Sequence, residues 1–171
     1  MTRYFDASAL VKRYVRETGS TTVRGLLASG IPATSRLSEV EVSSGIIRRS
    51  REGAFTLRHR DRMLAALQRD LPALAIVEVI PEIAADARAL LLRQSLRAGD
   101  AVQLASCLFL QRHWDEPVPF VAFDRRLLEA AQAEGLTIIP VPTDRRRKAT
   151  KAARPLRTSP RKSVDARRDT R

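Results

Sequence analysis

The sequence predicts an α/β fold with an open, mainly parallel sheet covered by helices on both faces. Short apolar runs of strand length alternate with longer segments of helical periodicity, as in units that place a helix between two parallel strands. The run Val118–Phe123 is apolar throughout, which is typical of a strand buried on both faces. With 171 residues, 44% of them hydrophobic, the chain has enough material for one full core.

The expected elements follow from these runs and from the glycines and prolines between them. Gly19 and Gly53 should end helices, Gly99 should separate two helices, and Pro81 suits a helix start. Strands are expected over residues 2–6, 30–34 (a turn and a brief strand), 75–80, 118–123 and 136–141. Helices are expected over residues 7–17, 20–28, 36–51, 56–70, 82–95, 100–112 and 124–134.

Composition excludes several classes of protein. No run approaches the roughly 18 apolar residues of a membrane span, and the first carboxylate, Asp6, comes too early for the apolar stretch of a signal peptide. We therefore expect a cytoplasmic protein with no membrane partner. A single cysteine, Cys107, excludes an internal disulfide and a multi-cysteine zinc site, and His59 and His113 lie far apart in the sequence.

Basic charge is concentrated at the C-terminus. The net charge is +12, of which residues 1–143 contribute 19 Lys/Arg against 16 Asp/Glu, and residues 144–171 contribute 12 against 3. The second segment has no apolar periodicity and contains Pro155 and Pro160, so we expect a disordered basic tail after a folded domain of residues 1–143. Such a charge balance indicates a polyanionic partner, most often nucleic acid.

Four acidic residues are placed to meet at one edge of the sheet. Asp6 and Asp124 each close a predicted strand, and ligands of open parallel sheets bind at the carboxyl ends of the strands. Asp100 begins a helix and Glu41 lies in the first turns of another. Because helix N-termini point toward that same edge in right-handed crossovers, we expect all four carboxylates to converge.

Helix capping is the alternative role for each acid taken singly. Asp6, Asp100 and Asp124 all stand where an Asp caps a helix, and the stretches Asp100–Gln103 and Ser38–Glu41 resemble capping boxes. Taken together, four carboxylates without basic partners would repel one another and raise some pKa values. A divalent cation removes that conflict, and Mg²⁺ prefers oxygen ligands, so the set favours a metal site.

The neighbours of Glu41 support a functional role for it. Ser44 and Gly45 stand one turn further on the same helix face and leave room for something to approach. Glu39 points about 160° away from Glu41, so we interpret it as a solvated or locally paired charge. Ser8 and Ser35 lack a nearby histidine and are interpreted as structural.

These motifs together resemble the PIN-domain family. Phe5-Asp6-Ala7-Ser8-Ala9-Leu10 is similar to the family's opening Asp motif, and Glu41-Val42-Ser43-Ser44-Gly45 to its helical Glu motif. Gly99-Asp100-Ala101-Val102-Gln103-Leu104-Ala105 and Val121-Ala122-Phe123-Asp124-Arg125-Arg126-Leu127 are similar to its two later Asp motifs. The motifs occur in the family's order over residues 4–141, and the subgroup they most resemble is the VapC-type toxins.

The resemblance implies a three-layer domain and a function. A VapC-type protein would be a Mg²⁺-dependent endoribonuclease, with Mn²⁺ as a possible substitute, and the toxin of a toxin–antitoxin pair. Asp6 and Asp100 would hold the metal, while Glu41 and Asp124 would complete the acidic pocket and position or deprotonate the attacking water. A homodimer and a cognate antitoxin partner are implied in the same way. Ala122 departs from the pattern, since many members carry Thr or Ser there.

Three other functions compete with this one. A phosphatase of the haloacid-dehalogenase type needs a second Asp two residues after the first, and that position is Ser8. A non-catalytic RNA-binding module would not need the intact set of four acids. A PIN-domain nuclease of RNA processing differs from a toxin in its partners and target, which these residues do not specify.

The tail generates a first prediction. Residues 144–171 contain no aromatic side chain to stack on bases, so they should bind RNA through counterion release, with a slope of roughly −0.7 per phosphate neutralised. Ending the chain after Thr143 should flatten the salt dependence of RNA binding by about 2 to 6 units while leaving the cut site and the cleavage rate at saturating RNA nearly unchanged. An unaltered salt slope would show that the tail does not tether RNA.

Overall fold

The computed structural model describes residues 1–141 and contains the α/β sheet that the sequence predicts. The sheet has the strand order β3-β2-β1-β4, and every neighbouring pair is parallel. Its strands are β1 (Thr2–Phe5), β2 (Ile31–Ser35), β3 (Ala75–Val77) and β4 (Phe120–Val121). The basic tail expected over residues 144–171 lies outside the described residues.

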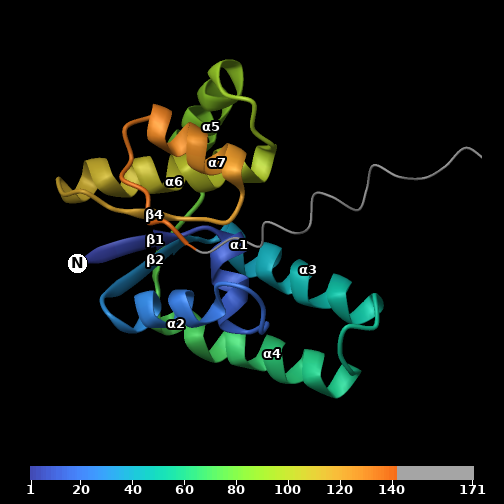
Figure 1. The fold of residues 1–171 in the computed structure, drawn as a ribbon. Helices are drawn as coiled ribbons and strands as arrows, with labels where there is room; N and C mark the ends of the chain where they lie inside the picture. The colour runs from blue at the N-terminus through green and yellow to red at the C-terminus, as the bar shows by residue number, and fades with distance from the viewer. Residues whose placement is uncertain (142–171) are drawn as a thin grey trace, which may run out of the picture.

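Helices cover both faces of the sheet, so the molecule has three layers (Figure 1). One layer consists of α5 (Pro81–Arg93), α6 (Ala98–Trp114) and α7 (Arg125–Ala133). The other consists of α1 (Ala7–Leu10), α2 (Ser20–Ala28), α3 (Leu37–Arg51) and α4 (Leu57–Asp70), with a short 3₁₀ helix η1 (Val11–Arg13) after α1 and another, η2 (Leu71–Ala73), after α4.

Strand alternation divides the core into two parts. Tyr4 and Phe120 belong to the core under α5, α6 and α7, and their rings stack with centroids 5.6 Å apart. The next residues of the same two strands, Phe5 and Val121, belong to the core on the α1–α4 side. This is the period of two that a strand imposes, and it explains why the segment that contains β4 is apolar throughout, since both of its faces are buried.

The helices follow from familiar local signals. In α3 the buried residues Ser38, Val42 and Ile46 recur at a spacing of four, so one face of the helix is turned to the core. Thr56 caps α4 by accepting a hydrogen bond from the His59 backbone N–H. Pro81 occupies the first turn of α5, as predicted.

The predicted helix over residues 7–17 is wrong in length. Regular α-helix ends at Leu10 and continues only as the 3₁₀ turn η1. The Ser20 hydroxyl donates to the Val15 carbonyl and accepts from the Glu17 N–H, so a local side chain satisfies backbone groups that a longer helix would have used.

The predicted strands at the C-terminal edge are also too long. Over residues 136–141 the only ladder contact is a parallel bridge between Ile138 and Phe120. Pro140 has no N–H with which to extend this ladder, and Pro119 interrupts the segment before β4 in the same way. Strand β3 likewise stops at Val77, three residues before the predicted end.

Among residues 1–141, no helix is long and apolar enough to cross a membrane.

Candidate active site

Asp6 follows β1 directly and is almost completely buried, with 5% of its surface exposed. Its backbone N–H donates to the Val121 carbonyl at 3.0 Å, and its carboxylate accepts from the Ser8 N–H at 2.9 Å, so Asp6 caps α1. Burial raises the pKa of Asp6 to about 6, with further contributions from the negative charges of Glu41 and Asp100, against the lowering effect of the Ser8 hydrogen bonds. A helix cap alone would not need this buried, destabilised charge.

Glu41 lies in the second turn of α3 and faces α6. Its carboxylate accepts a hydrogen bond of 2.7 Å from the side-chain amide of Gln103. Burial raises the pKa of Glu41 and the charge of Asp100 raises it further, while the Gln103 hydrogen bond lowers it. The capping box expected over Ser38–Glu41 is absent, because α3 begins at Leu37 with Arg36 as its N-cap.

Asp100 is the third residue of α6 and not its first. Its carboxylate accepts from the Arg97 backbone N–H at 3.3 Å, in a capping box with Arg97 at the N-cap position. Gly99, which was expected to separate two helices, lies inside the first turn of this helix. The helix therefore starts two residues earlier than predicted, because Arg97 and not Asp100 is the boundary residue.

Asp124 stands at the same end of the sheet but in a different electrostatic setting. It caps α7 by accepting from the Arg126 N–H at 2.8 Å, and the Arg126 guanidinium approaches its carboxylate to 3.4 Å. Partial burial would raise the pKa of Asp124, but the hydrogen bonds and charge of Arg126 outweigh it and the pKa is lowered. The expectation that all four acids lack a basic partner is therefore wrong for Asp124.

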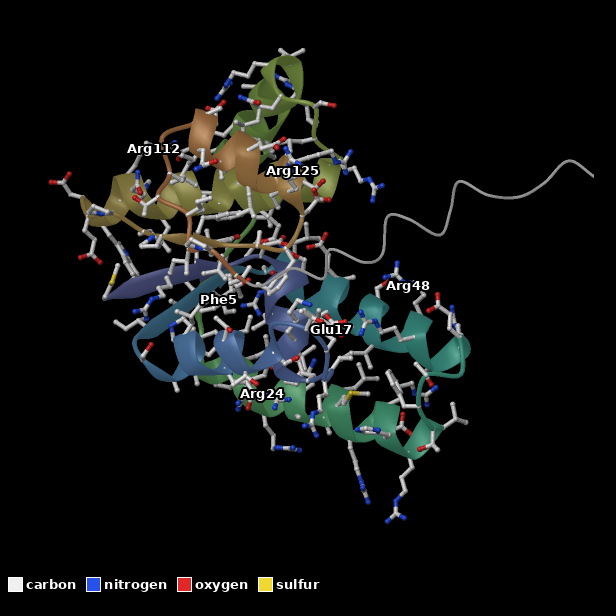
Figure 2. All side chains as sticks on the ribbon, in the orientation of Figure 1. Phe5, Glu17, Arg24, Arg48, Arg112 and Arg125 are labelled. Atoms are coloured by element: carbon white, nitrogen blue, oxygen red, sulfur yellow. The ribbon has the colours of Figure 1, made fainter. Side chains whose placement is uncertain are left out.

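Two side chains hold the segment before Asp124 against the N-terminal helix. The Ser8 hydroxyl accepts a hydrogen bond of 3.0 Å from the Phe123 N–H. The Lys12 ammonium lies 4.0 Å from the centroid of the Phe123 ring and forms an ion pair of 2.6 Å with Glu17. Glu17 also pairs with Arg49 of α3, and Figure 2 shows it between the N-terminal segment and that helix. These contacts join the segment after β4, the N-terminal segment that contains α1 and η1, and α3.

The structure thus brings three acids into mutual electrostatic range, namely Asp6, Glu41 and Asp100, with Asp124 on the adjoining loop. Within residues 1–141, none of these three carboxylates forms an ion pair with a lysine or arginine. Three unpaired carboxylates, one of them buried, are a donor set that suits a hard divalent cation. In the described part of the chain, no three His, Cys, Asp or Glu side chains lie close enough together to hold a metal ion as they stand.

Other residues considered in the sequence take structural positions. Glu39 accepts from Gln68 at 3.1 Å and pairs with Arg36, which agrees with the locally paired charge expected from its helical phase. The space beside Gly45 is taken by Val11 of this same chain, so it admits a packing neighbour rather than a ligand. Cys107 is buried, and burial raises the pKa of its thiol.

Sequence reasoning missed Gln103, which it treated only as part of a capping motif. The side chain is 0% exposed and contacts Glu41 directly. The available signal was a lone amide within the apolar run Ala101–Leu104, on a helix predicted to be buried.

A cavity of about 230 Å³ lies elsewhere, beneath η1 and α2. Its lining is mainly apolar, and Arg13 and Asp70 within it pair with each other. None of the four acids lines this cavity, so we place the candidate site at the sheet edge, where the perturbed carboxylates are.

Comparisons with known proteins agree with this fold. The family described as PIN domain matches residues 3–133, and the chain belongs to that family. Within it, two curated relatives from Mycobacterium tuberculosis strains are named Ribonuclease VapC45 and Ribonuclease VapC49. Each is 34% identical over 147 residues, which cover 82% of this chain and 96% of the relative.

Solved structures show the same fold. The crystal structure of Mycobacterium tuberculosis VapC20, described as a sarcin-ricin loop cleaving toxin, is similar with a TM-score of 0.60 and 18% identity, over 82% of this chain and 100% of that one. A toxin–antitoxin complex from Klebsiella pneumoniae contains a chain similar with a TM-score of 0.53 and 17% identity, over 72% of this chain and 87% of that one.

The buried carboxylate of Asp6 generates a prediction about stability. The raised pKa means that the buried site stabilises the protonated carboxyl group of Asp6 relative to the ionised carboxylate. This group therefore contributes most to the free energy of unfolding below a pH of about 4, and its contribution is lost as the pH rises through about 6. Asp6→Asn should therefore be more stable than the wild type at pH 7 by up to about 3 kcal/mol, with the difference vanishing near pH 4. Chemical denaturation in the presence of a chelator measures both. If Asp6→Asn and the wild type had equal free energies of unfolding at every pH, the raised pKa of Asp6 would be contradicted.

Proposed function

We propose that this protein is a Mg²⁺-dependent endoribonuclease and the toxin of a toxin–antitoxin pair. The observation that carries the proposal is that the carboxylates of Asp6, Glu41 and Asp100 lie within electrostatic range of one another, in a chain of the PIN-domain family. The pKa values of Asp6 and Glu41 are raised, and none of the three acids has an ion-pair partner among residues 1–141. The two curated relatives named as VapC ribonucleases support the reaction. A site of carboxylates that binds a divalent cation is suited to the hydrolysis of a phosphodiester bond.

Asp6 and Asp100 would hold the metal ion. Both offer oxygen ligands, and their mutual repulsion favours a cation over protonation at neutral pH. When bound, Mg²⁺ supplies a positive charge that stabilises the developing negative charge on phosphate oxygens and lowers the pKa of a coordinated water. Mn²⁺ prefers the same ligands and should substitute for it.

Glu41 and Asp124 would act on the attacking water. The raised pKa of Glu41 makes it the better of the two at accepting a proton near neutral pH. Asp124 has a lowered pKa and remains ionised, so it suits orienting the water by hydrogen bonding. Arg126, which pairs with Asp124, is placed to meet substrate phosphate from the first turn of α7.

The distribution of charge favours an RNA path over one layer of the domain. Residues 1–70 contain 13 Lys/Arg and 7 Asp/Glu, whereas residues 71–141 contain 6 and 9. The first set forms β1, β2 and the α1–α4 layer, where Figure 2 labels the exposed Arg24 and Arg48. Arg48 stands two turns beyond Glu41 on the same face of α3, about 10 Å along the helix axis. RNA leaving the site over α3 would meet positive charge.

The proposed partner is an antitoxin protein, and the proposed location is the cytoplasm, where RNA substrate is present. The name VapC on the curated relatives favours a toxin over a PIN nuclease of RNA processing. We also propose that the protein forms a homodimer.

The unpaired acids argue against a non-catalytic RNA-binding module, since binding an RNA phosphate would not require them.

The first test of this function is Asp100→Asn. Cleavage of single-stranded RNA by the wild type should need Mg²⁺ and stop with a chelator, and Asp100→Asn should abolish cleavage. The variant should melt at or above the wild-type temperature without metal, because one of three repelling charges is gone, and should gain less stability on adding Mg²⁺. Retained activity would reduce Asp100 to a capping residue, since Asn accepts the Arg97 hydrogen bond equally well.

A second test compares two neighbouring glutamates on α3. Glu41→Gln should lower the cleavage rate at saturating RNA by at least about tenfold, equivalent to about 1.4 kcal/mol in the barrier. Glu39→Gln should change it by no more than a factor of about three, because Glu39 contacts Arg36 and Gln68 on another face of α3. Equal effects would contradict the assignment of Glu41 to the site.

A further inference from the structure

A buried chain of hydrogen bonds ends on Glu41. The Tyr4 hydroxyl lies 2.8 Å from the Gln103 amide oxygen, and the Gln103 amide nitrogen lies 2.9 Å from the Ser38 hydroxyl and 2.7 Å from the Glu41 carboxylate. The Ser38 hydroxyl in turn lies 2.6 Å from the Thr34 hydroxyl, which donates to the Phe5 carbonyl at 2.7 Å. Tyr4, Gln103, Ser38 and Thr34 are all buried.

The donors in this chain can have only one arrangement. Thr34 gives its proton to the Phe5 carbonyl, so Ser38 must donate to Thr34. Ser38 then has only lone pairs left for Gln103, which fixes the amide nitrogen on that side. The same nitrogen has its second N–H directed at Glu41, and the amide oxygen accepts from Tyr4. Rotating the amide by half a turn would set its oxygen against the Glu41 carboxylate.

A second feature of α6 restricts Glu41 from the other side. A Cβ atom on Gly99 would lie 2.5 Å from the second carboxylate oxygen of Glu41. Any side chain at position 99 would therefore displace the carboxylate. Gly99 has no such atom, so the Glu41 side chain can lie against the first turn of α6, next to Asp100.

We propose that Gln103 and Gly99 are positioning residues that form a seat for the Glu41 carboxylate on α6, Gln103 by donating its amide N–H and Gly99 by leaving the space open. The inference rests on the proposed function, in which Glu41 acts on the attacking water. Without the seat, an ionised Glu41 would turn away from the buried acids that repel it. The seat holds it where the reaction needs it.

Two variants test the seat from its two sides. Gln103→Met removes the amide at nearly constant volume, and Gly99→Ala pushes the carboxylate away while replacing Gly with a better helix former. Each should lower kcat about tenfold and leave KM for RNA within about threefold. Gln111→Met is the matched control, since Gln111 also lies on α6 and binds only the Val118 backbone N–H. Its kcat should stay within about twofold of the wild type.

A double-mutant cycle separates positioning from a general loss of stability. If the seat acts through Glu41, Gln103→Met and Gly99→Ala should have little further effect on kcat in a Glu41→Gln background. Multiplying effects would overturn the proposal. Gln103→Met leaves the buried Tyr4 hydroxyl without its hydrogen-bond partner and removes one of the two partners of Ser38, so it lowers stability. If the loss of stability prevents its assay, Gly99→Ala decides the question alone.

Binding of Mn²⁺ gives a readout that does not depend on cleavage. Moving the Glu41 carboxylate away from Asp6 and Asp100 reduces the negative charge that attracts the ion bound by those two residues. The rise in melting temperature with added MnCl₂ should therefore be smaller for both seat variants than for the wild type and unchanged for Gln111→Met. If the wild type gains stability with Mn²⁺ but cuts no RNA, the proposed function fails. The difference in Mn²⁺-dependent melting temperature between the wild type and the seat variants then still decides whether the seat exists. If the wild type neither cuts RNA nor gains stability with Mn²⁺, both proposals are overturned.

Discussion

Burial of negative charge at the end of β1 is the constraint on which the rest of the site depends. Asp6 is held there by the sheet itself, because its backbone N–H is bound to the Val121 carbonyl of β4. Its carboxylate is buried beside two others, and the pKa of about 6 expresses the unfavourable free energy of that arrangement. A fold selected for stability alone would place an uncharged residue at this position.

The surrounding elements hold these charges in place by hydrogen bonds rather than by ion pairs. Ser8 donates its backbone N–H to Asp6, Arg97 donates its backbone N–H to Asp100, and Gln103 donates its amide to Glu41. Neutral donors stabilise a carboxylate without cancelling its charge. The negative field of the cluster therefore remains available for a cation, whereas a lysine or arginine in the same positions would have removed it.

Asp124 shows how the same residue type serves differently under another environment. It caps a helix as Asp6 does, but Asp124 is only partly buried, and Arg126 in the first turn of α7 lowers its pKa. Asp6 and Asp124 therefore have pKa values shifted in opposite directions within one edge of the sheet. Pairs of acids separated in this way are suited to distinct roles in proton transfer and charge stabilisation.

The layers are linked to the site through polar residues inside the core. Gln103 connects α6 to β1 through Tyr4 and to α3 through Ser38 and Glu41. A shift of α6 along its axis would leave several of these buried groups unpaired, each at a cost of about 1 to 3 kcal/mol. The network thus fixes the position of α6 relative to α3 more tightly than apolar packing would, since apolar contacts tolerate small sliding movements.

The sequence by itself determined the α/β class, the alternation of strands and helices, and the order of the acidic motifs. These follow from local signals: the apolar runs around Phe5 and Phe120, the spacing of Val42 and Ile46, and the cap at Asp124. The structure set three boundaries differently from the sequence prediction. The first α-helix is short because Ser20 binds backbone groups of Val15 and Glu17, and the last strand is missing because Pro140 has no N–H to donate. Helix α6 starts at Ala98 because Arg97 is its N-cap. The tertiary structure alone placed Gln103 against Glu41. Pairings between residues 62 positions apart depend on how layers pack, and no local pattern records which side chain lies opposite another.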